Sequence, residues 1–276
     1  MKFFLSARGE PNISMSVYYN KISNKLIIQK SQANDSYWDS HWDKIINENK
    51  IKDVDNFVRK TTSKYLAPGS KILEGGCGIG NKVYTLDKYG YDAYGVDYAQ
   101  STVNKVNEIL PALKISYGDV RKLQYENNFF DGYWSVGVIE HFWNGYNKIA
   151  KEMSRVIKAG GFLFLTFPSI SKLRKLKIYL NCYESKKDLE EPNDFYQFIL
   201  NSNSVVESFE KFRFIPVDRV YFDALKGIKD EMKIFNPVFQ KIYDSKSLYN
   251  KCIRKIFENV FSQITGHSCL IVFKKI

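Results

Sequence analysis

ILEGGCGIGNKVYTL, the stretch from Ile72 to Leu86, decides the fold. A short apolar run is followed by a glycine-rich run and then by a segment with the pattern of a helix. This order predicts a strand, a tight turn and a helix, an arrangement that commonly holds a nucleotide at the helix N-terminus. The residues of the turn indicate which kind of nucleotide it would take.

The turn departs from the pattern of nicotinamide-dependent enzymes, which reads GxGxxG. Counted from Gly76, the sixth position is Asn81, and counted from Gly75, the third position is Cys77. Glu74 precedes the glycines, where a carboxylate can bind an ammonium group but would repel a pyrophosphate. The residues therefore argue against a dehydrogenase.

Strands and helices alternate on either side of the turn. The pattern predicts strands at 71–74, 92–97, 113–117, 130–138 and 162–167, and helices at 81–88, 101–110 and 144–157. Gly160 and Gly161 are predicted to end the last of these helices. Alternation of this kind indicates βαβ units that build a parallel sheet with both faces covered by helices.

The regions outside this alternation are predicted from weaker patterns. They comprise a hairpin with its turn near Ser23 and Asn24, helices from Tyr37 and over 54–66, a mostly helical polar insertion at 169–210, a strand at 212–222, helices within 226–265 and a final strand at 268–274. The strands again favour an α/β class.

The stretch LEGGCGIG resembles motif I of the class I S-adenosylmethionine-dependent methyltransferases. The resemblance implies that the glycine backbone packs against the methionine and ribose parts of the cofactor, and that the acid holds its amino acid end. The positions that match are Glu74, Gly76, Cys77, Gly78 and Gly80. Cys77 is interpreted as a packing residue, and Gly75 departs from the family, which more often has an aliphatic residue there.

Two further acids follow in the order that the family shows. Asp97 ends the predicted second strand, where the resemblance implies a bond to both ribose hydroxyls; the alternative is an Asp that caps a helix. Asp119 and Val120 follow the third strand, where the family receives the adenine amino group and contacts the ring. Tyr98 lies where an apolar or aromatic residue often flanks the adenine.

The fourth strand, DGYWSVGVIEHF, resembles motif IV of the small-molecule branch, the methyltransferase type 11-like proteins. The backbone near Val136 and Gly137 would line the methionine side of the cofactor. Glu140 and His141 are the candidate catalytic pair, with His141 closing over the cofactor or deprotonating an acceptor hydroxyl; the alternative is a structural histidine at a helix start. RVIKAGGFLFLTFP resembles the helix, turn and strand that follow in the family.

The resemblance covers residues 71–167 and implies the whole architecture. We expect a Rossmann-like, doubly wound and mostly parallel sheet of seven strands, with an antiparallel last strand and helices on both faces. We divide the chain into an N-terminal segment with a helical lid (1–66), a cofactor-binding core (67–168), a helical insertion that forms part of the acceptor pocket (169–210) and the C-terminal part of the sheet (211–276).

The segment YWDSHW is similar to the N-terminal lid of many bacterial methyltransferases. Tyr37 and Trp38 would then contact the cofactor. The alternative is a helix that packs on the core, because its apolar residues recur at intervals of three and four.

The net charge is +11, but the lysines are spread along the chain without a block of five or six like charges. The densest cluster, KLRKLK at Lys172 to Lys177, could contact an anionic lipid surface or a phosphorylated, nucleotide-linked or lipid-linked acceptor. The alternative is a solvated helix face. No nucleic acid partner is expected, although the charge keeps an RNA or protein methyltransferase as an alternative.

Several classes are disfavoured by what the sequence lacks. The four cysteines form no CxxC pair, so no metal site is expected. No apolar run approaches the ~18 residues of a membrane span, and the apolar run near Met1 is too short for a signal peptide, so a cytoplasmic protein is expected. The turn of amino-methylating DNA enzymes and the nucleophilic cysteine of cytosine-C5 enzymes are also missing.

Methyl transfer to a small molecule, a glycan or a lipid precursor is therefore the favoured function, with oxygen as the favoured acceptor atom. S-adenosylmethionine is the cofactor that the resemblance implies. A protein that binds this cofactor without catalysis is the remaining alternative.

Overall fold

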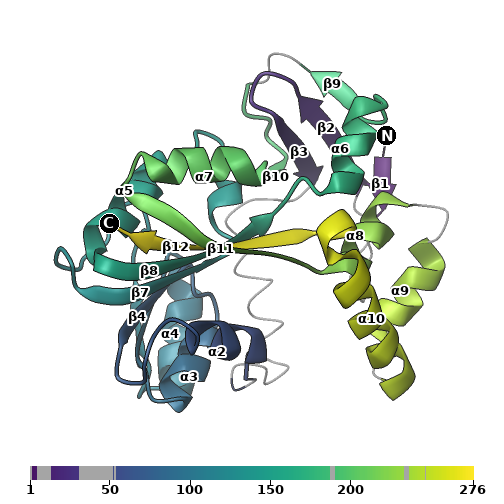
Figure 1. Ribbon diagram of the computed structural model, residues 1–276. Helices are drawn as coiled ribbons and strands as arrows, with labels where there is room; N and C mark the ends of the chain where they lie inside the picture. The colour runs from purple at the N-terminus through teal and green to yellow at the C-terminus, as the bar shows by residue number, and fades with distance from the viewer. Residues whose placement is uncertain are drawn as a thin grey trace. The chain divides into compact units, whose positions relative to one another are not determined.

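The computed structural model describes residues 2–4, 14–30, 52, 54–186, 190–232, 236–245 and 247–276 (Figure 1). The predicted lid residues Tyr37 and Trp38 lie outside these ranges. The chain divides into two compact units. The first comprises 1–31, 166–205 and 219–271, and the second comprises 32–165, 206–218 and 272–276.

A sheet of seven strands carries the alternating part of the sequence. Its spatial order is β11-β12-β8-β7-β4-β5-β6. The strands are β4 (Lys71–Gly75), β5 (Asp92–Asp97), β6 (Lys114–Tyr117), β7 (Phe130–Val136), β8 (Ile157–Pro168), β11 (Phe214–Phe222) and β12 (Ser268–Lys275). Strand β4 pairs in parallel with β5 and β7, and β5 with β6, which confirms the predicted mostly parallel sheet.

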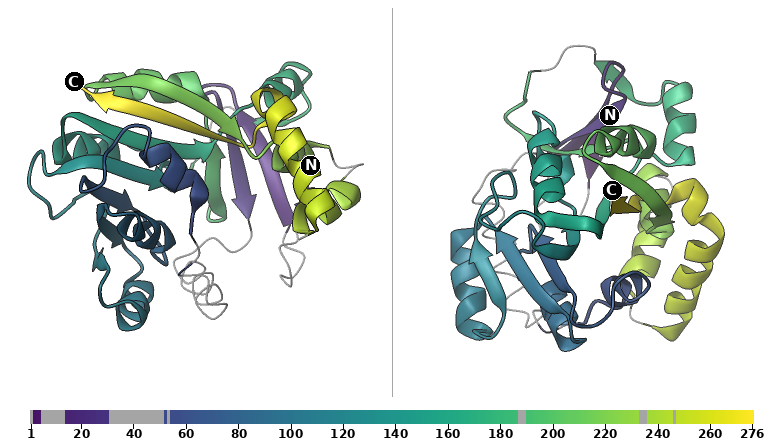
Figure 2. Two further views of the ribbon diagram at one scale, coloured as in Figure 1. Left: turned by 60° about the horizontal axis from the view of Figure 1, so that its bottom comes forward. Right: turned by 60° about the vertical axis from the view of Figure 1, so that its left-hand side comes forward.

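Strand β12 runs antiparallel to its neighbour β11. At one end of the pair the Ile276 N–H donates to Arg213 O at 2.9 Å, and at the other the His267 N–H donates to Asp223 O at 3.3 Å. Residue numbers thus rise along one strand as they fall along the other. Figure 2 shows the two strands side by side, and the predicted antiparallel last strand is confirmed.

Helices cover both faces of the sheet, as predicted. In Figure 1, α2 (Asn56–Thr62), α3 (Asn81–Lys88) and α4 (Gln100–Ile109) lie on one face, and α5 (Asn147–Val156) lies on the other. Trp134 on β7 points to the face of α2, where its indole N–H donates to Thr62 Oγ1 at 3.0 Å and its ring stacks on Phe164. The side chain of Tyr133 points to the opposite face, because neighbouring residues of a strand alternate.

The prediction that Gly160 and Gly161 end a helix is wrong. Helix α5 ends at Val156, and both glycines lie within β8. Gly160 has a φ of +81°, and a Cβ at Gly161 would meet Asp131 O at 2.8 Å. Glycine is therefore required at 160 by its positive φ and at 161 by the close approach of the neighbouring backbone, and neither position caps a helix.

The prediction of a mostly helical segment over 169–210 is also wrong in its middle. The segment contains α6 (Lys172–Tyr179), β9 (Glu184–Lys186), β10 (Phe195–Ile199) and α7 (Ser202–Glu210). Strand β10 pairs antiparallel with β3 (Lys25–Lys30), and β9 pairs parallel with β2 (Ser14–Asn20). Partners this distant along the chain leave no local pattern in the sequence.

A second, smaller sheet holds the N-terminal strands, in the order β1-β2-β3-β10 with β1 at Lys2–Phe4. The β2–β3 hairpin turns at 21–24, where Asn20 Oδ1 accepts the N–H groups of Ile22 and Ser23. This confirms the predicted hairpin. Buried apolar side chains of this unit form one cluster: Val17, Leu26, Ile28, Ile170, Tyr183 and Ile199.

The predicted helical region near the C-terminus consists of α8 (Ala224–Glu231), α9 (Asn236–Asp244) and α10 (Leu248–Thr265). A buried ionic network joins α8 to α6. Arg174 is only 1% exposed, and it donates to Glu231 Oε1 at 2.8 Å and to Ser169 O at 2.8 Å. Lys177 and the Tyr183 hydroxyl also donate to the Glu231 carboxylate.

Within the described ranges, no helix combines the length and the apolar character that crossing a bilayer requires.

Candidate functional site

The carboxyl ends of the parallel strands bring the predicted site residues to one edge of the sheet. Glu74 lies at the end of β4, Asp97 ends β5, Asp119 follows β6, and Gly137 follows β7. These four strands are neighbours in the sheet. In open α/β sheets this edge is where ligands bind.

The glycine turn has a backbone that L-residues rarely adopt. Gly76, Gly78 and Gly80 have φ of 74°, 50° and 73°. The Gly76 N–H donates to Val96 O at 2.8 Å, which holds the turn against β5. A Cβ at Gly76 would meet Val138 Cγ2 at 2.6 Å, so both conformation and space require glycine at this position.

Asp97 ties the glycine turn to the start of α4. Its Oδ2 accepts the Gly78 N–H at 2.7 Å, and its Oδ1 accepts the Ala99 N–H at 2.9 Å. The side chain is buried. An ionised carboxylate has about four lone-pair sites, so it can accept further donors from a ligand while it holds the two backbone groups.

Glu74 is a buried carboxylate that lacks a full set of partners. Its Oε1 lies 3.7 Å from Lys82 Nζ, and its Oε2 has no hydrogen-bond partner among the described residues. Burial raises the pKa of Glu74 to about 7, against the opposing charge of Lys82. A cationic donor would satisfy the orphaned oxygen and favour the ionised form.

Asp119 is bound by an arginine that the sequence did not indicate. It accepts the backbone N–H of Arg121 at 2.8 Å, and the two side chains form an ion pair at 2.7 Å. Partial burial would raise the pKa of Asp119, but the hydrogen bonds from Arg121 outweigh it and lower the pKa below its usual range. The Arg121 guanidinium also lies 5.3 Å from the centre of the Phe142 ring, so it joins the loops after β6 and β7.

The neighbours of these acids differ in exposure. Val120 is buried, whereas Tyr98 is 51% exposed.

Cys77 is buried, and its Sγ lies 2.9 Å from where a Cβ at Gly95 would be. Burial raises the pKa of the Cys77 thiol well above its usual value, so the thiol stays protonated, as the packing interpretation requires.

The segment after β7 places both candidate catalytic residues on one short helical turn, η2 (Ile139–His141). Glu140 is buried, its Oε2 has no hydrogen-bond partner among the described residues, and burial raises its pKa to about 8. Its Oε1 lies 3.5 Å from where a Cβ at Gly137 would be. His141 is half-buried, and Val136 precedes the turn at the end of β7.

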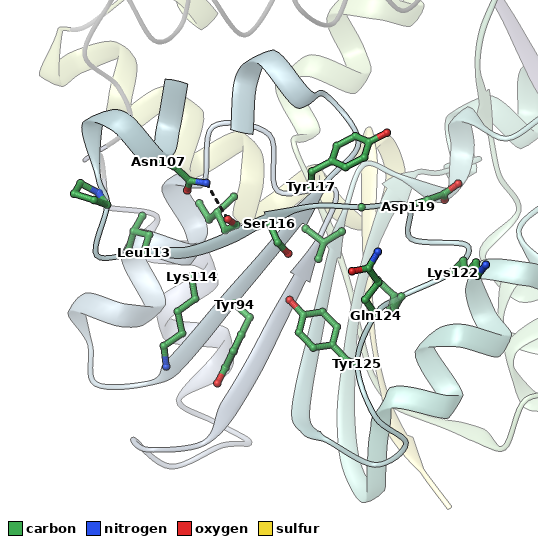
Figure 3. A pocket seen from close by; sticks show the side chains of 15 residues that line it. Tyr94, Asn107, Leu113, Lys114, Ser116, Tyr117, Asp119, Lys122, Gln124 and Tyr125 are labelled. Carbon is green, nitrogen blue, oxygen red and sulfur yellow. Dashed lines mark hydrogen bonds between the residues drawn. The ribbon is translucent and has the colours of Figure 1, made fainter. Parts of the chain in front are cut away.

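A pocket of about 580 Å³ lies beside this site (Figure 3). It follows β5 and β6, with Tyr94, Ser116 and Tyr125 among its lining residues, and it meets the predicted site at Asp119. The sequence analysis missed these lining residues. The alternation of side chains along β5 could have indicated Tyr94, because it places Tyr94 and Asp97 on opposite faces of the sheet.

The Tyr133 side chain packs against Gly75, the position at which the sequence departs from the family pattern. A Cβ at Gly75 would lie 1.9 Å from the Tyr133 hydroxyl oxygen, so the tyrosine fills the space of the missing side chain. That hydroxyl is buried and has no hydrogen-bond partner among the described residues.

We therefore expect Gly75→Ala to lower the free energy of unfolding by about 1–3 kcal/mol through overpacking. Tyr133→Phe should be near neutral, because it removes a hydroxyl that makes no hydrogen bond to any described residue. The double variant should recover part of the loss. Urea unfolding of all four proteins measures this coupling, and additive effects would contradict it.

Known proteins match this chain over the segment that carries the candidate site. Residues 73–165 match a family model described as "Methyltransferase domain". A 2-methyl-6-phytyl-1,4-hydroquinone methyltransferase of Synechocystis sp. is 34% identical over 102 residues, which are 36% of this chain and 32% of that protein. A demethylmenaquinone methyltransferase of Bacillus mycoides is 32% identical over 113 residues, covering 37% and 47%. The matches thus span less than half the length of these two curated relatives.

Solved structures resemble this chain in fold over a longer stretch than the sequence matches cover. A TehB-like SAM-dependent methyltransferase from Corynebacterium glutamicum has a TM-score of 0.55 at 14% identity, and the match covers 88% of this chain and all of that one. Residues 73–165 therefore match a methyltransferase family model in the part of the chain where the glycine turn predicted one, and the fold resembles that of a SAM-dependent methyltransferase. The cofactor of this family is S-adenosylmethionine.

Proposed function

We propose that this protein transfers the methyl group of S-adenosylmethionine to a small-molecule acceptor. The observation that carries the proposal is the buried Oε2 of Glu74 beside the glycine turn, which has no hydrogen-bond partner in the part of the chain that the structure describes. The cofactor presents an ammonium group, two ribose hydroxyls and an adenine amino group, which are all hydrogen-bond donors. The site presents acceptors in return, so the residues fit the cofactor.

Each acid binds one part of the cofactor in this proposal. Glu74 binds the ammonium group, Asp97 accepts the ribose hydroxyls, and Asp119 receives the adenine amino group. Contacts from backbone and side chains complete the site: Gly76, Cys77, Gly78, Gly80, Tyr98, Val120, Val136 and Gly137. Roles for Tyr37 and Trp38 stay predictions, as does the place of 169–210 in an acceptor pocket.

When bound, the cofactor supplies a methyl group on a positively charged sulfur, which an acceptor atom can displace. The chain mainly orients the reactants, and this orientation alone can lower the activation free energy by several kcal/mol. A base would assist an acceptor hydroxyl. His141 is the better candidate, because a carboxyl with a pKa of about 8, such as Glu140, is mostly protonated at neutral pH.

The acceptor class rests on the relatives. Those with matching segments are named for hydroquinone, demethylmenaquinone and phosphoethanolamine methylation. They support a small-molecule acceptor, and we propose a small molecule or a glycan or lipid precursor. Methylation on oxygen stays a prediction from the sequence, since the relatives whose names give an atom are an N- and a 4-C-methyltransferase.

The test is transfer of a radiolabelled methyl group from S-adenosylmethionine to a panel of hydroquinones, glycans, lipid precursors, RNA and protein. Calorimetric titration with S-adenosylhomocysteine should accompany it. We expect cofactor binding and labelling of a small molecule. Binding with labelling of RNA or protein alone would overturn the acceptor class, and absence of binding would overturn the whole proposal.

The raised pKa of Glu74 predicts a pH dependence of cofactor affinity. A bound ammonium group lowers this pKa, so binding releases a proton and affinity should rise with pH from about 6 to about 8 before levelling. Glu74→Gln should bind more weakly and lose the rise. Calorimetry across this range checks it, with the exposed Glu108→Gln as control; a rise that persists in Glu74→Gln would assign it to another group.

The same carboxyl should limit the stability of the free protein. Its pKa is about 7 when folded and about 4.3 when unfolded, so stability falls as pH rises between these values. Above about pH 7 the loss is complete, at roughly 4 kcal/mol. Glu74→Gln should therefore be more stable than the wild type at pH 8 and similar to it at pH 4, as measured by urea unfolding.

A further inference from the structure

Arg121 holds the Asp119 carboxylate through three donor groups. Its backbone N–H donates to Oδ1 at 2.8 Å, and its side-chain Nε donates to Oδ1 at 3.0 Å and to Oδ2 at 2.9 Å. Its terminal nitrogen Nη2 lies 2.7 Å from Oδ2. Parallel contacts between a guanidinium and a carboxylate fix the direction of the carboxylate as well as its distance.

This arrangement leaves one acceptor site on the carboxylate. An ionised carboxylate has about four lone-pair sites, and Arg121 provides three donor hydrogens, one each from its backbone N–H, Nε and Nη2. Partial burial opposes ionisation of Asp119, but the hydrogen bonds from Arg121 lower its pKa below the usual range. The group therefore accepts hydrogen bonds at neutral pH, and its remaining site can take a single further donor.

Phe142 in turn supports Arg121. The guanidinium lies 5.3 Å from the centre of the Phe142 ring, within the distance at which a cation and an aromatic ring attract each other. Phe142 directly follows η2, the turn that carries His141. A chain of contacts thus runs from that turn through Phe142 and Arg121 to Asp119.

We infer that Arg121 is a positioning residue, which holds the Asp119 carboxylate so that its remaining acceptor site takes the adenine amino group. The inference rests on the proposed function, in which Asp119 receives that group. The side chains of Arg121 and Asp119 are 52% and 42% exposed, and ion pairs this exposed contribute little to the stability of a fold. The effect of Arg121 is therefore expected in the recognition of adenine rather than in unfolding.

The test compares two ligands, S-adenosylhomocysteine and its analogue with hydrogen in place of the adenine amino group. Calorimetry should find that the wild type binds the first ligand about 10-fold more tightly or better, because the analogue lacks a hydrogen bond to a charged acceptor. Arg121→Met should lower this ratio by about fivefold, because the carboxylate must then be ordered when the ligand binds. The affinity for the analogue should stay nearly unchanged, whereas a merely structural role would weaken both ligands equally.

Further variants separate the hydrogen bonds from the charge. Lys122→Met, one residue along the chain, removes an exposed cation and should keep the wild-type ratio. Arg121→Lys keeps the charge but cannot form the parallel bonds, so it should restore the ratio only in part. Phe142→Leu should lower the ratio less than Arg121→Met does, and adding it to Arg121→Met should cause no further loss. Thermal unfolding establishes that each variant is folded.

An unchanged ratio in Arg121→Met, or an equal loss of affinity for both ligands, would overturn the inference. Tighter binding of S-adenosylhomocysteine by Arg121→Met would also overturn it, because Arg121 would then compete with adenine for Asp119. A further loss in the double variant would remove Phe142 from the chain of contacts. A wild type that binds neither ligand would defeat the proposed function as well, whereas a wild type that prefers S-adenosylhomocysteine and an Arg121→Met protein with the same preference reject this inference alone.

Discussion

Asp97→Asn should lower the affinity for S-adenosylhomocysteine by about 100-fold or more, since a charge-assisted hydrogen bond contributes roughly 1.5–3 kcal/mol and two are expected to the ribose. The carboxylate already accepts the N–H groups of Gly78 and Ala99. An amide can accept only through its oxygen, so its NH₂ group would face one of these donors. The glycine turn would then lose a tether as well as the ribose contacts.

The matched control is Asp92→Asn, at the opposite end of the same strand. Asp92 pairs with Lys114 at the surface, where an ion pair contributes about 0–1 kcal/mol. Calorimetry should find its affinity unchanged. An affinity of Asp97→Asn within a few-fold of wild type would remove Asp97 from the cofactor site. Thermal unfolding should also show Asp97→Asn less stable by about 1–3 kcal/mol, from the orphaned N–H.

Arg174→Met should lower the free energy of unfolding by about 3–5 kcal/mol, which is the cost of breaking a buried ion pair from one side. The arginine is buried, and its loss removes the donor to Glu231 Oε1 and to the Ser169 carbonyl, while Lys177 and Tyr183 still donate to Glu231 Oε2. Methionine fills much of the volume, so the effect comes from charge and hydrogen bonding rather than from a cavity.

Lys175→Met, one residue further along α6, is the control. Its side chain is exposed, and surface substitutions of this kind usually change stability by less than about 0.5 kcal/mol. Urea unfolding of both variants gives the comparison. A loss below about 1 kcal/mol in Arg174→Met would mean that Lys177 and Tyr183 satisfy Glu231 without it.

The fold between β4 and β8 could be predicted because each of its elements has a local pattern. Apolar runs of strand length alternate with amphipathic helices, and glycine or proline separates several of them. Between α5 and β8 no such residue intervenes, and there the predicted boundary was wrong. The small sheet could be predicted only at its hairpin. Strand β10 pairs with β3 across some 170 residues of chain, and nothing in FYQFI shows that partner.

The candidate site also contains residues that the sequence could indicate and residues that it could not. Glu74, Asp97 and Asp119 could be found because they directly follow or end predicted strands at fixed places relative to the glycines. Arg121 could not be found, because its role depends on where a flexible side chain points. Tyr133 could not be paired with Gly75 either, since the two meet only through the register of β4 and β7.

The place of β12 between β8 and β11 has a consequence for the protein during its synthesis. Strand β8 is complete at Pro168, but its neighbour begins at Ser268, about 100 residues later. At roughly 5–20 residues per second, the ribosome needs about 5–20 seconds to supply it. During that time the apolar edge of β8, from Phe162 to Phe167, stays unpaired. Unpaired edges of this kind associate with other chains, so the nascent protein is most vulnerable to aggregation in this interval.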